Sequence, residues 1–295
     1  MSSNRFRADL STLWLLGKPV HHSLSPLIQN TAIEQLGEKY LYLATAVESQ
    51  DFDQVVKSLP LLGAVGANVT VPYKLDAHRL CDRLSPEAEV MGAVNTLHFR
   101  EGRVEGHNTD GLGWWNALGE ECPLGQREKS LVIGAGGATR AICHTLLSQG
   151  GRSLKILNRT QSKAEALRDE LLQHYPDAEI EVRPLSHFCS LLEGHGLVVQ
   201  TTSVGLHDDK SPVPLPSQWP QKTFLSELIY GRTTSLMKRA SELGAPVQDG
   251  LGMLCGQAAL SLSLWLGKEP SQIPLESMLA AARAVVNKRR EEFGS

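Results

Sequence analysis

Apolar runs alternate with amphipathic segments along the first third of the chain. Strand, helix, strand, helix and strand are predicted in turn at 12–17, 26–36, 40–46, 51–59 and 64–71. Two shorter strand-like pieces then flank Glu101 and Gly102, which predicts a hairpin. Strands that alternate with helices pair mostly in parallel and are covered by those helices on their faces. The first part of the chain is therefore predicted to form a mixed, mostly parallel sheet.

The same alternation begins again at Lys129. Strands are predicted at 129–133, at 154–158, within "GLVVQTTSVG" and at 224–230. The stretch "HDDKSPVPLPSQWP" holds four prolines between 212 and 220 and predicts a surface loop. After "QDGLGMLCGQAALSLSLWLG" the pattern is helical to the end, and Pro274 begins the last helix. The whole pattern predicts an α/β protein of two domains with a helical tail.

The composition narrows the class of protein. A chain of 295 residues is long enough for one large or two ordinary domains. The net charge of −3 gives no electrostatic signature of a nucleic-acid-binding protein. No apolar run approaches the length of a membrane span, and the polar start "MSSNRFRADL" is not typical of a signal peptide. We expect no nucleic-acid or membrane partner, and the composition leaves a monomer and a homodimer open.

The cysteines and histidines indicate neither a disulfide framework nor a metal site. The five cysteines are scattered and never stand in CxxC spacing, which fits reduced thiols in the cytoplasm. The ten histidines show neither HxxxH spacing nor pairing with cysteine, so no zinc site is predicted. The adjacent His21 and His22 favour solvent exposure over metal binding. A cytoplasmic protein without a metal is therefore expected.

A glycine-rich turn, "GAGGATR", follows the strand at 129–133. Gly134 permits a tight turn, and Gly136 lets backbone N–H groups approach a pyrophosphate. The N-terminus of the helix that follows favours negative charge. Thr139 stands where the third glycine of this motif is usual. Between a strand and a helix, the motif favours dinucleotide binding over a tight turn without a ligand.

The end of the next strand indicates which dinucleotide binds. A protein that binds NAD usually carries an acid here, which accepts a hydrogen bond from the ribose 2′-hydroxyl. This chain has only neutral or cationic side chains at the corresponding place: Asn158, Arg159, Thr160 and Lys163. A guanidinium suits a 2′-phosphate, whereas cations near a helix N-terminus are unfavourable unless an anion is present. The sequence therefore predicts NADP as the cofactor.

Polar side chains stand at the ends of strands in the first predicted domain. They are Ser23, Ser25, Thr70, Lys74, Asn95 and Asp110. Each alone has an ordinary explanation as a helix cap, a turn former or a solvated lysine. Open α/β sheets bind ligands at strand ends, so their joint occurrence favours a binding site. In "GANVTVPYK", Pro72 is predicted to end the strand at the edge of that site, with Lys74 facing a substrate.

Eight motifs together resemble those of the shikimate/quinate dehydrogenase family. They are "GKPVHHSLSP", "GANVTVPYK", "GAVNTL", "GHNTDG", "GAGGATR", "NRT", "TTSVG" and "DGLGMLCGQAA". They follow the family's order and cover most of the chain, from Gly17 to about Gly267. The resemblance implies a substrate-binding domain at 1–112 and a Rossmann-type NADP-binding domain at 113–249. It also implies C-terminal helices at 250–295 that return to the first domain.

The resemblance further implies the activity, which is the reversible, NADPH-dependent reduction of 3-dehydroshikimate to shikimate in chorismate and aromatic amino acid biosynthesis. By position, Lys74 and Asp110 match the family's catalytic pair. The residues that match substrate contacts are Ser23, Ser25, Thr70, Asn95, Asp110, Tyr230 and Gln257, with the two serines at the substrate carboxylate. The residues that match cofactor contacts are Gly134, Ala135, Gly136, Gly137, Ala138, Asn158, Arg159, Thr160, Lys163, Ser203, Leu228 and Gly250.

The chemistry of a lysine agrees with the role that the resemblance gives to Lys74. Hydride transfer from nicotinamide C4 to a carbonyl builds negative charge on the oxygen, and an ammonium in contact with it stabilises that charge and donates a proton. Asp110 would hold this ammonium in place. The residues leave open which of the two accepts the proton in the oxidation.

The chain departs from the family pattern at several places. Gln29 stands where His is frequent, Glu227 replaces the usual Asp, and Gln200 replaces a common Asn. The stretch "YGRTTSL" is also shorter than the family's loop after this tyrosine. These changes leave open a dehydrogenase of quinate or of an aminated shikimate. A non-catalytic NADP-binding sensor is the alternative of another class, and the presence of both Lys74 and Asp110 argues against it.

Overall fold

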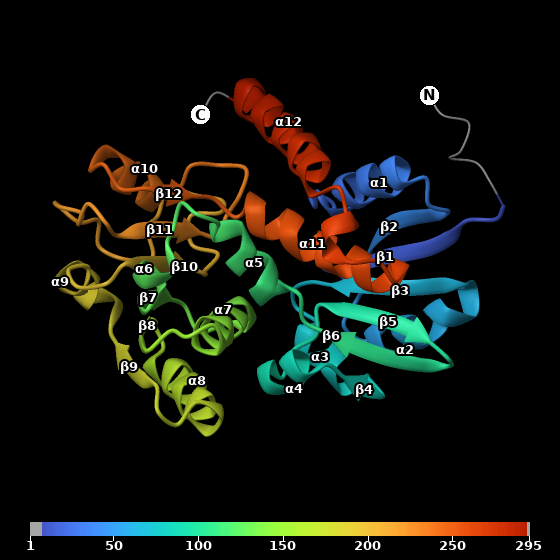
Figure 1. The fold of residues 1–295 in the computed structure, drawn as a ribbon, viewed down its shortest axis with the longest axis horizontal. Helices are drawn as coiled ribbons and strands as arrows, with labels where there is room; N and C mark the ends of the chain where they lie inside the picture. Colours follow the sequence, from blue (N-terminus) through green and yellow to red (C-terminus); the bar gives the residue numbers. More distant parts are fainter. Residues whose placement is uncertain (1–7, 294–295) are drawn as a thin grey trace. The chain divides into compact units, whose positions relative to one another are not determined.

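The computed structural model describes residues 8–293, so most of the polar start that bears on a signal peptide lies outside the described residues. The chain folds into two compact units. The first runs up to Gly113 and includes Leu254–Ala284, and the second comprises Trp114–Met253 with the chain from Val285. Each unit has a six-stranded sheet with helices packed on it (Figure 1). The predicted α/β class is confirmed.

The first unit has a mixed sheet with the strand order β2-β1-β3-β5-β6-β4. The strands are β1 (Ser11–Gly17), β2 (Tyr40–Ala46), β3 (Ala64–Val69), β4 (Arg83–Leu84), β5 (Thr96–Arg100) and β6 (Arg103–His107). β1 pairs in parallel with β2 and β3, whereas β5 runs antiparallel to β3 and β6. The predicted hairpin is confirmed, since β5 and β6 are joined at Glu101 and Gly102.

Helices pack on this sheet. Those that lie wholly in the first unit are α1 (Ser25–Leu36), α2 (Phe52–Ser58), η2 (Leu59–Leu62), α3 (Lys74–Arg79), α4 (Pro86–Met91) and η4 (Pro270–Gln272), whereas α5 (Asp110–Leu118), α11 (Leu251–Leu266) and α12 (Leu275–Phe293) belong to it only in part. Phe52 and Val56 of α2 pack with Ala67 and Val69 of β3 in one core cluster. α11 is fixed by Trp265, whose Nε1 donates to Leu97 O at 2.9 Å. The part of α11 from Leu254 onward therefore belongs to the core of the first unit.

The second unit has a sheet with the order β12-β11-β10-β7-β8-β9, in which every pair is parallel. Its strands are β7 (Lys129–Ile133), β8 (Ser153–Leu157), β9 (Glu179–Arg183), β10 (Leu197–Gln200), β11 (Phe224–Glu227) and β12 (Val247–Gln248). Its helices are α6 (Leu124–Arg127), α7 (Gly137–Ser148), α8 (Gln161–His174), η3 (Leu185–His187), α9 (Phe188–Leu191) and α10 (Ser235–Glu242). Counted from β7, this is the 3-2-1-4-5-6 order of Rossmann sheets, whose order reverses between β7 and β10.

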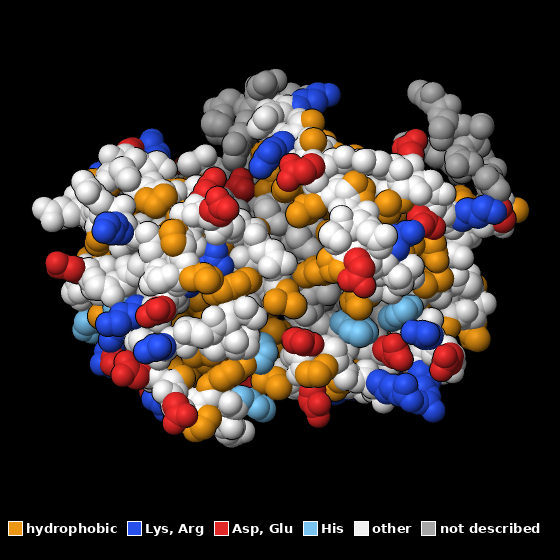
Figure 2. Space-filling view, viewed as in Figure 1, with side chains coloured by type: hydrophobic (Ala, Val, Ile, Leu, Met, Phe, Trp, Pro, Cys, Tyr) orange, Lys and Arg blue, Asp and Glu red, His pale blue; other side chains and the backbone are white. Residues whose placement is uncertain are grey.

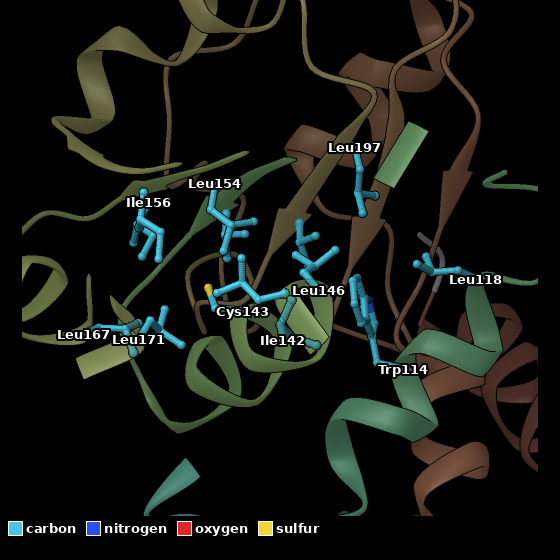
Figure 3. Packing of buried hydrophobic residues seen from close by; sticks show 14 of the residues in the cluster. Trp114, Leu118, Ile142, Cys143, Leu146, Leu154, Ile156, Leu167, Leu171 and Leu197 are labelled. Atoms are coloured by element: carbon cyan, nitrogen blue, oxygen red, sulfur yellow. The ribbon is translucent and has the colours of Figure 1, made fainter. Parts of the chain in front are cut away.

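Both faces of the second sheet are buried. Val132 of β7 lies in one core cluster with Ile142 and Leu146 of α7, and Figure 3 shows these α7 side chains directed toward Leu154 of β8. Leu131, the neighbour of Val132, lies in the cluster on the other face. This alternation explains why the strands of this unit are nearly continuous apolar runs.

The structure corrects two expectations for the loops. β3 ends at Val69 rather than at 71, and Val71 is 66% exposed, so the strand stops before Pro72 is reached. The proline-rich stretch is not wholly a surface loop, because Val213 and Trp219 are buried in the core beside Phe188. Trp219 Nε1 donates to Thr223 O at 2.8 Å, which satisfies the polar edge of the buried ring.

The surface agrees with the weak net charge. Acidic and basic side chains are interspersed over the face shown in Figure 2. Within residues 8–293, no helix is long and apolar enough to cross a membrane.

Candidate active site

Lys74 is the first residue of α3, and the residue before it anchors the start of this helix. Tyr73 is buried, its hydroxyl donates to Val47 O at 2.5 Å, and its ring stacks on Phe52 with the ring centroids 4.5 Å apart. The carbonyl of Lys74 accepts from Val94 N at 2.9 Å. The Lys74 side chain is 20% exposed, and its ammonium pairs with the Asp110 carboxylate. The amine is therefore fixed in position yet accessible to a ligand.

Asp110, the first residue of α5, is buried and uses its two oxygens differently. Oδ2 accepts from Lys74 Nζ, and Oδ1 accepts from Asn95 Nδ2 at 2.9 Å. The backbone N–H of Asp110 donates to Asn108 Oδ1 at 3.1 Å. The structure thus brings Lys74, Asn95 and Asp110 together, as expected from their places at strand ends.

Gln257 reaches the same group of residues through a close crossing of α5 and α11. A Cβ added at Gly113 would overlap Gln257 N, and one at Gly256 would lie 2.7 Å from Gly113 O. Only glycine fits at this crossing without moving one of the helices. The approach leaves Gln257 Oε1 3.5 Å from Asn95 Nδ2.

The topology places these residues at one edge of the first sheet. β1 and β3 are parallel, so Ser23, which follows β1, and Thr70, which follows β3, lie beyond the same ends of the strands. β5 runs antiparallel to β3, so Asn95, just before β5, lies at that edge as well. Ser23 Oγ donates to Ser25 Oγ at 3.1 Å, which holds the two hydroxyls as a pair. Such a pair can offer hydrogen-bond donors to a carboxylate.

In the second unit, the glycine-rich turn has room for a phosphate group. Gly134 has a φ of 125°, which favours glycine, and a Cβ there would overlap Thr201 Oγ1. Gly136 and Gly137 are exposed, and a Cβ added at either would meet no atom within 4 Å. The N-terminus of α7 is therefore open to an anion, which fits the pyrophosphate of a dinucleotide.

Thr139 has a structural reason to replace the third glycine. Its side chain is buried, and its hydroxyl accepts from Gly136 N at 3.0 Å. The same hydroxyl lies 2.7 Å from Thr201 Oγ1. Thr139 thus joins the turn after β7 to the loop after β10, at the point where the strand order reverses.

The start of α8 carries two cations, and its first turn holds no acid. Both cations, Arg159 and Lys163, are exposed. None of the ion pairs on neighbouring elements in residues 8–293 involves either side chain. Asn158 Nδ2 donates to Thr160 O at 2.8 Å and shapes the turn between them. Cations here oppose the helix dipole, so a bound anion such as a 2′-phosphate would stabilise this end.

The remaining predicted residues follow β10 and β11 in the second unit. Gly250 packs against Leu228 so closely that a Cβ at Gly250 would overlap Leu228 O. Gly250 N also donates to Ile229 O at 3.2 Å. Ser203 is exposed in the loop after β10, and Tyr230 is half-buried in the loop after β11. Tyr230 therefore belongs to the second unit, whereas the other predicted substrate residues belong to the first.

Comparison with known proteins identifies the family. Three family profiles match: "Shikimate dehydrogenase substrate binding domain" at 15–97, "Shikimate / quinate 5-dehydrogenase" at 121–207, and "Shikimate 5'-dehydrogenase C-terminal domain" at 250–283. A shikimate dehydrogenase (NADP(+)) of Methanopyrus kandleri is 37% identical over 285 residues, which cover 94% of this chain and 97% of that protein. The chain belongs to the shikimate dehydrogenase family.

Solved structures of this family have the same fold. The shikimate 5-dehydrogenase of Thermus thermophilus, in complex with NADP(H) and shikimate, is 35% identical with a TM-score of 0.80, over 93% of this chain and 99% of that one. A quinate dehydrogenase from Corynebacterium glutamicum, in complex with NAD, is 25% identical with a TM-score of 0.85, over 94% and 99%. The fold therefore occurs with different substrates and cofactors, and side chains must discriminate between them.

Two departures from the shikimate dehydrogenase pattern are buried amides that fix the backbone. Gln29 Nε2 donates to Ala258 O at 3.0 Å and so joins α1 to α11. Gln200 holds the loop after β10, because its Nε2 donates to Thr202 O at 3.1 Å and its Oε1 accepts from Thr202 N at 2.5 Å. Both substitutions therefore support elements that carry predicted site residues.

The third departure, Glu227, is a buried carboxyl group that secures both ends of the loop after β11. Its Oε1 accepts from Ile229 N at 3.1 Å, and its Oε2 accepts from Thr234 Oγ1 at 3.0 Å. Thr234 caps α10 by accepting from Met237 N at 3.3 Å. Burial raises the pKa of Glu227 to about 7, although these hydrogen bonds act in the opposite direction.

We expect Glu227→Gln to change the pH dependence of stability. Because the folded state raises the pKa of Glu227 from 4.5 to about 7, its contribution to stability is fully present below pH 4.5 and is lost as pH rises through 7. The wild type should therefore lose about 3 kcal/mol of unfolding free energy between pH 4.5 and 7 that Glu227→Gln does not lose. Urea unfolding at several pH values measures this, with the exposed Glu165→Gln as control. A difference that stays constant with pH would contradict the assignment.

Sequence reasoning missed several polar residues beside the site. They are Asn68, Thr96, Thr109 and Ser261, and all four are buried. Thr109 directly precedes Asp110, and its hydroxyl accepts from Asn95 Nδ2 at 2.9 Å. A signal was present in Asn68, which stands between Ala67 and Val69 in an otherwise apolar strand. A buried amide must find hydrogen-bond partners, so its place in the strand indicates a polar network.

Proposed function

We propose that this protein is an NADP-dependent shikimate dehydrogenase, an oxidoreductase that reduces 3-dehydroshikimate to shikimate and catalyses the reverse oxidation. The observation that carries the proposal is the Lys74–Asp110 ion pair at the carboxyl edge of the first sheet, in a member of this family. Such an activity belongs to the route to chorismate and the aromatic amino acids.

We propose that the first unit binds and protonates the substrate. Lys74 would donate a proton from Nζ to the carbonyl oxygen as negative charge develops there, and Asp110 would hold the ammonium in line. Asn95 and Gln257 lie beside this pair and would bind ring hydroxyls, together with Thr70. The paired hydroxyls of Ser23 and Ser25 would bind the substrate carboxylate. Tyr230 is proposed as a substrate residue from the family resemblance alone.

We propose that the second unit binds NADP, whose reduced form would supply the hydride for the reduction. The open N-terminus of α7, with Gly134, Ala135, Gly136, Gly137 and Ala138, would receive the pyrophosphate. Asn158, Arg159, Thr160 and Lys163 at the start of α8 would bind the 2′-phosphate. Ser203, Leu228 and Gly250, which follow β10 and β11, would complete the cofactor site.

The proposal is tested by absorbance at 340 nm with NADP⁺ or NAD⁺ and either shikimate or quinate. We expect turnover of shikimate with NADP⁺ and a much higher KM for NAD⁺. Turnover of quinate alone would make the protein a quinate dehydrogenase instead. An aminated shikimate is tested in the same way. If NADP⁺ binds but none of the three acids is turned over, the protein is better explained as a non-catalytic NADP-binding sensor.

We also propose that the protein acts in the cytoplasm as a monomer or homodimer. The five cysteines are all free thiols, which is typical of proteins in a reducing compartment. Sedimentation velocity of the purified protein separates monomer from homodimer.

A further inference from the structure

A continuous set of buried polar side chains leads from the core of the first unit to Asp110. The set, here called the Tyr42–Asp110 network, consists of Tyr42, Asn68, Thr96, Asn95, Thr109, Ser261 and Asp110. These side chains come from distant elements, among them β2, β3, β5 and α11, and none of the seven residues is more than 5% exposed. Burying this many polar groups is costly unless all of them have partners, so the directions of their hydrogen bonds are strongly constrained.

The network begins at the buried hydroxyl of Tyr42. Tyr42 donates its hydroxyl proton to Asn68 Oδ1 at 2.8 Å, and burial raises the pKa of Tyr42 well above its ordinary value, so it keeps this proton. Asn68 Nδ2 also donates to the backbone carbonyl of Asn95 at 3.2 Å, which can only accept, so the orientation of the Asn68 amide is fixed. Nδ2 donates toward Thr96 Oγ1 at 3.1 Å and Ser261 Oγ at 3.0 Å.

The next step fixes the amide of Asn95. Thr96 Oγ1 donates to Asn95 Oδ1 at 2.9 Å, and the backbone N–H of Thr109 donates to the same oxygen at 2.9 Å. A flipped amide would set its NH₂ group against the Thr109 N–H, which can only donate. Asn95 Nδ2 must therefore face Asp110 Oδ1, to which it donates at 2.9 Å.

Ser261 lies one turn after Gln257 on α11 and contacts the same network. Its hydroxyl donates to Gln257 O at 2.9 Å and lies 2.8 Å from Thr96 Oγ1. Thr109 Oγ1 donates to the same Gln257 carbonyl at 3.1 Å. The turn of α11 that carries Gln257 is thus joined to the residues that orient Asn95.

We propose that Thr96 and Ser261 are positioning residues of the reaction, which orient Asn95 and, through it, the Asp110 carboxylate that holds Lys74. The inference rests on the proposed function, because it assigns these residues to the same site. Thr96 and Ser261 act through Asn95 and Gln257 rather than on the substrate. A hydroxyl group is needed at each place because it can donate to one neighbour and accept from another.

Thr96→Val tests this role, since it removes the hydroxyl and nearly keeps the shape of the side chain. We expect kcat for shikimate oxidation to fall roughly 10- to 100-fold, because small displacements of reacting groups have effects of this size. Thr96→Ser should restore kcat to within a few-fold of the wild type. KM for NADP⁺ should stay unchanged in both variants, because the predicted cofactor residues lie in the second unit.

Thr223→Val is the matched control for the loss of a buried hydroxyl. Thr223 is also buried, its Oγ1 donates to His195 O at 2.7 Å, and it lies in the second unit outside the network. We expect kcat of this variant within about twofold of the wild type, although its thermal stability should fall much as that of Thr96→Val does. Equal losses of kcat in the two valine variants, or no rescue by Thr96→Ser, would overturn the proposal.

A second pair of variants keeps the test independent of Thr96. Ser261→Ala should lower kcat several-fold, whereas Ser263→Ala on the same helix should not, because the Ser263 hydroxyl donates only to Leu260 O of its own helix, at 2.8 Å. Wild-type kcat in Ser261→Ala would overturn the role of that residue. If the wild type does not oxidise shikimate at all, the proposed function fails. If it does and Thr96→Val is fully active, the positioning role alone fails.

Discussion

Lys74→Ala is expected to lower kcat for shikimate oxidation roughly 10²- to 10⁴-fold, the usual contribution of a positioned acid or base. The reason is that Lys74 is the amine that pairs with Asp110 and remains partly exposed at the edge of the first sheet. KM for NADP⁺ should change little, because the residues that fit the cofactor lie in the second unit. Steady-state rates at 340 nm over a range of both substrates separate kcat from KM.

One further variant shows whether the proton or only the charge of Lys74 matters, and a second serves as its control. Lys74→Arg keeps a cation, but a guanidinium does not lose its proton in proteins, so kcat should stay close to that of Lys74→Ala. Lys57→Ala, an exposed lysine of α2 in the same unit, should have wild-type kinetics. Near-normal turnover by Lys74→Ala would remove Lys74 from the reaction.

Arg159→Ala is expected to raise KM for NADPH roughly 10- to 100-fold and to leave KM for NADH unchanged. Hydrogen bonds to a charged group are worth about 1.5 to 3 kcal/mol, which corresponds to this range. Arg159 is exposed beside the N-terminus of α8, whose first turn holds no acid that could pair with it. The loss should fall entirely on the cofactor that carries the 2′-phosphate.

The control for this prediction lies on the same helix. Arg168 of α8 already pairs with Asp169, at 2.7 Å, so Arg168→Ala should leave both KM values unchanged. The preference for NADPH should also weaken with added salt, because exposed charges are screened. An Arg159→Ala variant with the wild-type ratio of the two KM values would contradict the assignment of NADP to this chain.

The alternation of strands and helices could be read from the sequence because both faces of the second sheet are buried. Its central strands, such as 129–133, are continuous apolar runs between turn signals. β9 was missed because it lies at the sheet edge and carries charged residues, among them Glu181 and Arg183, which pair at 2.6 Å. The buried Trp219 was missed because the prolines around it are typical of a surface loop.

The sequence predicts the Lys74–Asp110 pair but not the Tyr42–Asp110 network behind it. Lys74 and Asp110 stand at the ends of predicted elements, and parallel pairing brings such ends to one edge of the sheet. The network behind them depends on contacts between distant segments, such as Thr96 of β5 with Ser261 of α11, 2.8 Å apart. Local patterns carry no information on such a contact, although buried polar residues in apolar strands mark where it must form.

A reduction assay with 3-dehydroshikimate and NADPH, in which shikimate is quantified by chromatography, measures the proposed activity itself. With the wild type, one shikimate should form for each NADPH consumed, and Lys74→Ala should bind NADPH normally but form almost none. A wild type that consumes no NADPH would contradict the proposed activity, and a Lys74→Ala variant that forms shikimate at the wild-type rate would contradict the role of Lys74.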